Sequence, residues 1–208
     1  MKKVALFFFG LLSICCPAQN VSSVFENMPK YLILPIDSVQ RQDLIDLYKN
    51  NLSENVKDQL NGEVALDSLQ EDFMELHSGN FSMQIALLKL VNDSKIILLN
   101  QTVCAPACDS RLSFYTVDWK PLNTSDFIFP VDASWFIKED VDKTGENFIN
   151  VSKSLDMDLM QFRFDPENSE LIQTYTTPQY LSKEDRMAIE PFLKQEPKIF
   201  VWRKFGFK

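Results

Sequence analysis

The feature that most constrains the fold is the stretch of residues 95–122, KIILLNQTVCAPACDSRLSFYTVDWKPL. Residues 96–103 form an apolar, β-branched run of strand length, and residues 111–119 alternate between two faces. Between them, Ala105-Pro106-Ala107 is a turn signal, because a short loop with Pro separates two strand-like runs. The stretch therefore predicts one antiparallel hairpin.

Two cysteines, Cys104 and Cys108, face each other where the arms of this hairpin meet. Facing residues of a non-hydrogen-bonded antiparallel pair come within disulfide reach, so we predict a structural disulfide. Two free thiols, or a redox or metal pair, are the alternatives. Redox sites usually have CxxC spacing and zinc needs further ligands, and the single histidine of the chain excludes a Cys2His2 site.

The first 18 residues have the pattern of a signal peptide. Lys2 and Lys3 precede an apolar run at residues 4–14 that is too short to span a bilayer, and cleavage is expected after Ala18. No other stretch approaches membrane-spanning length, so we predict a periplasmic or secreted protein without a membrane span. An outer-membrane lipoprotein anchored at Cys15 or Cys16 is the disfavoured alternative, because Ile14 stands where a small residue is expected.

Composition narrows the function classes. The formal net charge is −8, and an acidic surface argues against nucleic acid and anionic membranes as partners. The apolar fraction of 45% is that of an ordinary globular protein rather than a disordered one. Only 5 glycines occur and no G-x-G-x-x-G or G-K-[ST] motif is present, so we predict no cofactor.

Residues 19–122 read as one helix followed by four antiparallel strands. Asp37 or Ser38 can cap a helix that runs to about Asn50. Its expected apolar stripe is Leu44, Ile45, Leu47 and Tyr48, and its expected solvent face is Arg41, Asp43 and Asp46. Residues 71–77 and 81–91 supply two strands, and the hairpin at residues 95–122 supplies the other two.

Residues 123–208 predict a second, smaller half packed on the first, although the two could form one continuous domain. A hairpin is expected at residues 156–176, and short strands are possible at 135–137 and 148–151. Ser182 opens a helix that Pro191 kinks or shortens. The aromatic strand at 198–207 is apolar on both faces, which predicts a central or covered strand. The predicted class is α+β, with a helix packed on a mostly antiparallel meander sheet followed by a β-hairpin/helix/strand half.

Candidate metal and catalytic residues are few. Asp140, Asp142, Thr144 and Glu146 resemble the first half of a calcium loop, but Val151 stands where the bidentate Glu is expected, and a polar loop is the favoured interpretation. His77 is the only histidine, and no nucleophile motif accompanies it. We therefore predict no resident metal and no catalytic residues.

The chain resembles a family of exported Bacteroidales proteins of unknown function, the domain of unknown function 3256. The resemblance rests on Met28-Pro29, residues 41–46, Asn61-Gly62 and above all CAPACDSRLSFYTVDWKPL at residues 104–122. It implies a location in a Gram-negative envelope or outside the cell, and it brings no activity.

The sequence thus favours a non-enzymatic module of the bacterial envelope that binds an unidentified envelope protein. We predict the contact patch at Pro106, Arg111, Tyr115 and Trp119, since Tyr, Trp and Arg dominate interface energetics. The alternative for Tyr115 and Trp119 is that they fill the core. The alternative function is a periplasmic hydrolase or glycan-binding protein that uses surface carboxylates.

Overall fold

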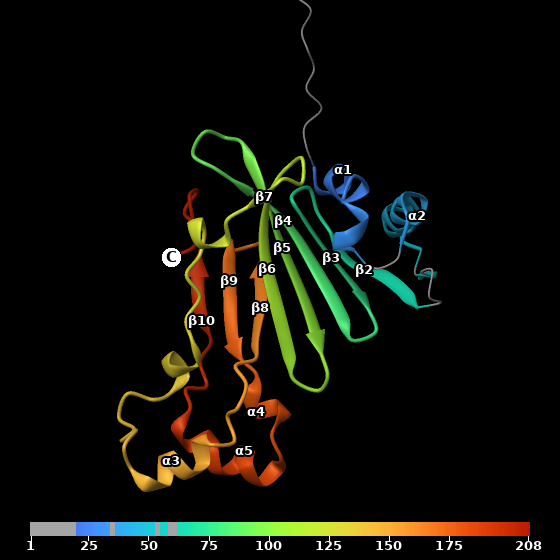
Figure 1. Ribbon diagram of the computed structural model, residues 1–208. Helices are drawn as coiled ribbons and strands as arrows, with labels where there is room; N and C mark the ends of the chain where they lie inside the picture. Colours follow the sequence, from blue (N-terminus) through green and yellow to red (C-terminus); the bar gives the residue numbers. More distant parts are fainter. Residues whose placement is uncertain (1–19, 34–35, 53–54, 58–61) are drawn as a thin grey trace, which may run out of the picture.

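The computed structural model describes residues 20–33, 36–52, 55–57 and 62–208. The predicted signal peptide at residues 1–18, with Cys15 and Cys16, lies outside the described residues. The described chain forms two antiparallel sheets, a helical layer on one side and a helical lobe at one end (Figure 1). The predicted α+β class is confirmed.

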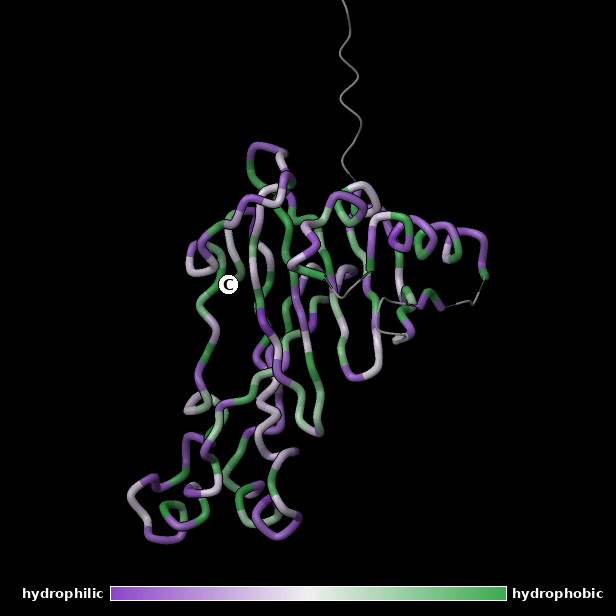
Figure 2. Tube along the Cα trace, turned by 45° about the vertical axis from the view of Figure 1, so that its right-hand side comes forward, coloured by the Kyte–Doolittle hydropathy of each residue, from purple (hydrophilic) through white to green (hydrophobic). Residues whose placement is uncertain are grey.

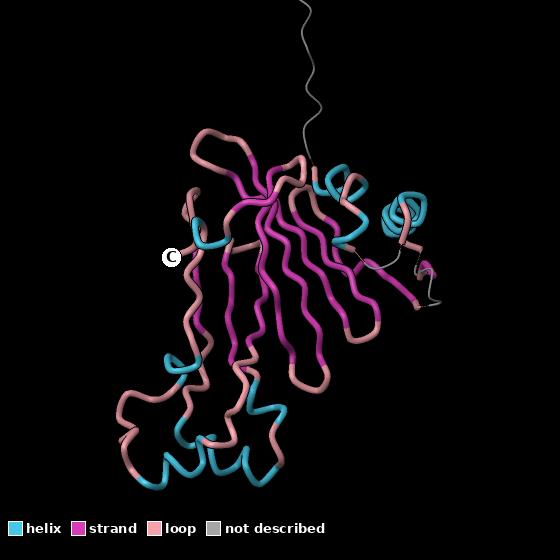
Figure 3. Tube along the Cα trace, viewed as in Figure 1, coloured by secondary structure: helices cyan, strands magenta, loops and turns pink. Residues whose placement is uncertain are grey.

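The larger sheet is a meander in which seven strands follow each other in chain order (Figure 3). The strands are β1 (Val56–Lys57), β2 (Glu63–Leu69), β3 (Phe73–Ser78), β4 (Phe81–Lys89), β5 (Lys95–Cys104), β6 (Cys108–Thr116) and β7 (Pro121–Leu122). The four predicted strands are β3 to β6. The prediction missed β2, because a register shift between Leu66 and Ser68 interrupts its alternation of inward and outward side chains.

Three helical segments cover one face of this sheet: α1 (Val21–Glu26), η1 (Lys30–Leu32) and α2 (Ser38–Lys49). The predicted cap of α2 is confirmed, because the Asp37 carboxylate accepts from the amides of Val39 and Gln40, and the Gln40 side chain accepts from the Asp37 amide. Leu44 and Ile45 of α2 are buried in the core with apolar residues of α1 and β2 to β5.

The prediction that Arg41 lies on the solvent face of α2 is wrong. The residue is only 3% exposed, and Nη1 donates to the carbonyl oxygens of Phe25 at 3.0 Å and Met28 at 2.6 Å. Burial lowers the pKa of its guanidinium, and the Asp37 and Glu26 carboxylates oppose that shift. Arg41 is inside because the end of α1 leaves carbonyl groups that need a donor.

The smaller sheet packs on the other face of the large sheet, with strand order β10-β9-β8. Its strands are β8 (Met160–Asp165), β9 (Glu170–Tyr175) and β10 (Lys198–Val201). The core between the sheets holds Phe73, Phe114, Phe162, Phe164 and Phe200 among others. The predicted hairpin is confirmed. The prediction of a central or covered last strand is wrong, because β10 is an edge strand whose Ile199 is 46% exposed.

A helical lobe lies at one end of the smaller sheet, where β8 and β10 begin and β9 ends (Figure 1). The remaining helical segments are η2 (Thr124–Asp126), η3 (Ala133–Phe136), α3 (Glu146–Ser152), α4 (Thr177–Tyr180), α5 (Lys183–Ile189) and η4 (Glu190–Phe192). Ser182 caps α5 as predicted, and Pro191 lies in η4, where the α-helix has already ended. The strands considered at 135–137 and 148–151 are absent from this described region: η3 ends at Phe136, Ile137 forms only an isolated bridge to Leu193, and α3 occupies residues 148–151.

Hydrophobic residues run along the strands of both sheets and through the helical lobe (Figure 2). None of the described helices is both long enough and apolar enough to cross a membrane.

Candidate interaction surface at the hairpin tip

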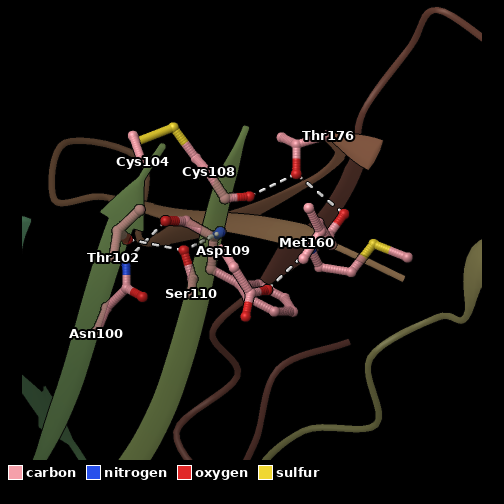
Figure 4. The surroundings of a disulfide bond; sticks show 10 residues. Asn100, Thr102, Cys104, Cys108, Asp109, Ser110, Met160 and Thr176 are labelled. Carbon is pink, nitrogen blue, oxygen red and sulfur yellow. Dashed lines mark hydrogen bonds between the residues drawn. A yellow bond between two sulfur atoms is a disulfide. The ribbon is translucent and has the colours of Figure 1, made fainter. Parts of the chain in front are cut away.

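The tip of the β5–β6 hairpin is closed by the two cysteines. The sulfur atoms of Cys104 and Cys108 lie 2.01 Å apart, and the two residues are the last facing pair of the ladder, with Cα atoms 3.9 Å apart (Figure 4). The amide of Ala105 donates to the Ala107 carbonyl at 3.0 Å inside the turn. The pair is thus at disulfide distance, as predicted.

The base of the tip is tied to the smaller sheet. The Thr176 hydroxyl donates to the carbonyl of Cys108, and the Asp109 carboxylate accepts from the amide of Met160 at 3.1 Å (Figure 4). These two contacts of the second arm, at Cys108 and Asp109, fix where the tip stands relative to β8.

The four predicted contact residues divide into two groups. Pro106 and Arg111 are exposed, whereas Tyr115 and Trp119 are 8% and 6% exposed. Trp119 donates from Nε1 to the carbonyl of Val24 at 3.0 Å, and its ring centroid lies 5.4 Å from that of Tyr115. The two aromatic residues therefore belong to the core under the helices. They cannot form part of an accessible contact patch.

The register of β4, β5 and β6 shows where the helical cover ends. Leu87, Ile97 and Tyr115 form one buried row across the three strands. Two rows nearer the tip, Gln101 donates to the carbonyl of Leu32, the last residue of η1, at 2.9 Å.

Nearer the tip, side chains on the same face of the sheet are exposed in the described part of the chain. Arg111 faces Gln101 across the ladder and is exposed, and Val103 in the next row is 52% exposed beside the half-buried Phe81. Tyr31 of η1 is 78% exposed at the rim. The side chain of Arg111 has no hydrogen bond or ion pair in the described part of the chain.

We call this region the tip surface, and it consists of Tyr31, Phe81, Val103, Pro106 and Arg111. The sequence analysis had predicted two of these residues, Pro106 and Arg111, as contact residues. Val103 could have been found from the alternation of β5, whose even and odd positions face opposite layers. Tyr31 carries no such signal, because its exposure depends on where η1 ends over the sheet.

The calcium candidate forms a turn before α3. The Asp142 carboxylate accepts from the amide of Thr144 at 2.9 Å and from its hydroxyl at 2.7 Å, and these hydrogen bonds lower the pKa of Asp142. Glu146 is the first residue of α3. Over the described ranges, no three His, Cys, Asp or Glu side chains are grouped to hold a metal ion.

Carboxylates also line a cleft of about 520 Å³ between β2–β3 and the turn after β8. Asp67 and Glu75 come from the larger sheet, and Asp165 and Glu167 from the smaller. Hydrogen bonds led by that of the Asn168 side chain lower the pKa of Asp165, so this carboxyl is ionised near neutral pH and is unsuited to act as a general acid. His77 lies close to this cleft, with Nδ1 2.8 Å from Asp67 Oδ1.

Comparison with known proteins identifies relatives without an assigned activity. A family model described as "Protein of unknown function (DUF3256)" matches residues 13–207. The chain is similar to the structure of a domain of an uncharacterized protein from Porphyromonas gingivalis W83, with 24% identity, a TM-score of 0.79, and coverage of 89% of this chain and 96% of that one. This likeness shows a shared fold. No curated protein matches the chain.

Proposed function

The chain belongs to the DUF3256 family of proteins of unknown function, and we propose that it is an exported envelope protein whose tip surface binds another protein. The observation that carries the proposal is the open end of the large sheet. There, exposed apolar and cationic side chains share one face of a disulfide-closed hairpin. Export is supported by the signal-peptide pattern of residues 1–18 and by the cysteine pair, since disulfides persist in oxidising compartments.

Rigidity favours the tip surface as a docking site. The cysteine pair closes the turn, and Thr176 and Met160 hold the second arm of the hairpin. A hairpin whose backbone is already held in place loses little conformational entropy when a partner binds, so more of the contact energy remains as affinity.

The exposed side chains of the tip surface indicate what kind of protein surface would bind it. Val103 and Tyr31 offer apolar contact area, and Arg111 offers a guanidinium that no described side chain engages. A partner that matches this surface presents an apolar segment with a carboxylate at its edge, because Arg pairs with carboxylates in a planar, two-point geometry.

The test uses the chain from Gln19 onward, immobilised and exposed to the envelope fraction of its own cells. A protein partner captured by the wild type should be lost from the double variant V103D/R111E, since both changes oppose the proposed contact. The captured protein, once identified, should bind the purified wild-type chain in a titration, and the double variant should bind at least about tenfold more weakly.

Arg163→Glu is the matched control, because Arg163 is also an exposed strand arginine but lies on β8, away from the tip surface. This variant should bind the partner like the wild type. Equal binding by V103D/R111E, with unchanged melting temperatures for all three proteins, would overturn the assignment of the tip surface.

A further inference from the structure

A pocket of about 200 Å³ lies between the end of the smaller sheet and the helical lobe, and none of its lining residues belongs to the tip surface. Its walls come from η3, β9, α4, α5, η4 and the segment that leads into β10. Pockets for drug-sized ligands usually measure about 300–1,000 Å³, so this one can enclose a single ring or the end of a longer molecule.

Part of the pocket lining is apolar. Tyr175 lines the pocket, and its ring stacks, with centroids 5.6 Å apart, on that of Phe136, a lining residue that is only 2% exposed. Pro178 and Pro197 also line it. Flat aromatic and proline surfaces of this kind pack against the C–H faces of a ring.

The lining also includes a hydrogen-bond donor, Arg186, and two acceptors, Glu190 and Glu196. Arg186 uses Nη2 to donate to the Gln179 carbonyl at 3.2 Å, which occupies one of its five N–H groups. The carboxylates of Glu190 and Glu196 have no ion pair or hydrogen bond in the described chain. Planar groups with paired donors or acceptors suit adjacent hydroxyl groups, because each hydroxyl can give one hydrogen bond and accept two.

The charges around the pocket do not favour an anion. Lys194 lines the pocket, but its Nζ lies 3.4 Å from Glu139 Oε1 and 4.6 Å from the Trp135 ring centroid, so the ammonium is already engaged. The pocket lining then has one other cation, Arg186, and two carboxylates, in a chain of net charge −8. A free anion would meet net repulsion here.

We propose that this pocket binds an uncharged, polyhydroxylated ring, such as one sugar residue at the end of a glycan. The ring's C–H face would lie against Tyr175 and the prolines, and its hydroxyls would pair with Arg186, Glu190 and Glu196. This site is separate from the tip surface and does not depend on it.

The experiment is a titration of the 15N-labelled chain from Gln19 onward with methyl glycosides of glucose, mannose and galactose and with N-acetylglucosamine, at millimolar concentrations. At least one sugar should give saturable amide shifts at Tyr175, Gln179, Arg186 and Glu196. The variants R186Q and E190Q should each weaken that binding by about tenfold, because each removes a charged hydrogen-bonding group.

Arg163→Gln is the control for R186Q, since it removes an exposed arginine from β8 and should leave sugar binding unchanged. V103D/R111E should also bind the sugar normally, which separates this site from the proposed protein contact. The inference is overturned if no sugar shifts these amides. It is also overturned if R186Q and E190Q, folded as judged by their spectra, bind like the wild type, or if inorganic phosphate occupies the pocket in preference to every sugar.

Discussion

Helices pack on one face of the seven-stranded sheet, and the smaller sheet packs on the other. Both covering layers contain buried backbone groups that need hydrogen-bond partners, and the two faces supply these partners differently. On the helical face, three side chains donate to carbonyls at or near helix ends. Arg41 reaches Phe25, Trp119 reaches Val24, and Gln101 reaches Leu32.

On the other face, side chains of the large sheet form a row along the free edge of β8. Gln84 accepts from the amide of Phe164 at 2.9 Å and donates to its carbonyl at 3.3 Å. Asn100 donates to the Phe162 carbonyl at 2.7 Å, and Ser110 accepts from the Phe162 amide at 2.9 Å. These side chains take the place of a neighbouring strand.

The difference follows from the two kinds of secondary structure. A helix satisfies its backbone internally except at its ends, so its buried carbonyls are few and lie together. A strand edge leaves an N–H and a C=O unpaired at every second residue, so burying it requires partners at regular intervals. Gln84, Asn100 and Ser110 supply these partners from three adjacent strands.

The largest effect on stability should come from Gln84→Leu. Leucine has a volume similar to that of glutamine, but it leaves the N–H and C=O of Phe164 buried without partners. We expect a loss of about 2–5 kcal/mol in the free energy of unfolding, because each unsatisfied group costs about 1–3 kcal/mol. Urea denaturation measures this loss in the free energy of unfolding. Because Asn100 also donates to Gln84 Oε1 at 3.1 Å, the combination with Asn100→Leu should cost less than the two single changes added together.

Arg41→Met should be the largest effect on the helical face. It retains the buried stem but removes the donor to Phe25 and Met28, and we expect a loss of about 2–3 kcal/mol. Arg41→Lys keeps the positive charge but replaces the planar guanidinium with a single ammonium group. Its melting temperature should lie between those of the wild type and Arg41→Met. If Arg41→Met were as stable as the wild type, these carbonyls would not depend on the side chain.

Ser110→Ala should cost about 1–2 kcal/mol, because the amide of Phe162 loses its acceptor. Ser113→Ala is the control: it lies on the same strand, faces the helical side, and no side-chain hydrogen bond involves it in the described structure. Amide hydrogen exchange of Phe162 should accelerate in Ser110→Ala and stay unchanged in Ser113→Ala. Equal exchange in both variants would contradict the role of Ser110 at the strand edge.

The smallest effect should come from Gln101→Leu, which makes the same chemical change as Gln84→Leu on the opposite face. Gln101 is only partly buried, so water can replace it at the Leu32 carbonyl, and we expect a loss of about 0.5–1 kcal/mol. Denaturation of the two leucine variants under one condition compares the faces directly. If Gln101→Leu cost as much as Gln84→Leu, a strand edge would need its partners no more than a helix end does.

Some errors of the sequence prediction have the same origin as this contrast. Arg41 was expected in solvent because the pattern of α2 gives no information on the carbonyls of α1. Residues 148–151 contain Ile149 and Val151 and favour a strand by composition, yet they lie in α3, which packs against α5. In both cases the deciding partner is a distant segment.

The sequence by itself determined the β5–β6 hairpin with its facing cysteines, the Asp37 cap of α2 and the β8–β9 hairpin. Each depends on residues within a few positions of one another or on the twofold alternation of a strand. Only the tertiary structure decided that Gln84 would meet Phe164, which lies 80 positions later, and that the helices would cover Tyr115 and leave Val103 and Arg111 open. Satisfying buried polar groups is a property of packed layers, and local sequence patterns do not specify how those layers meet.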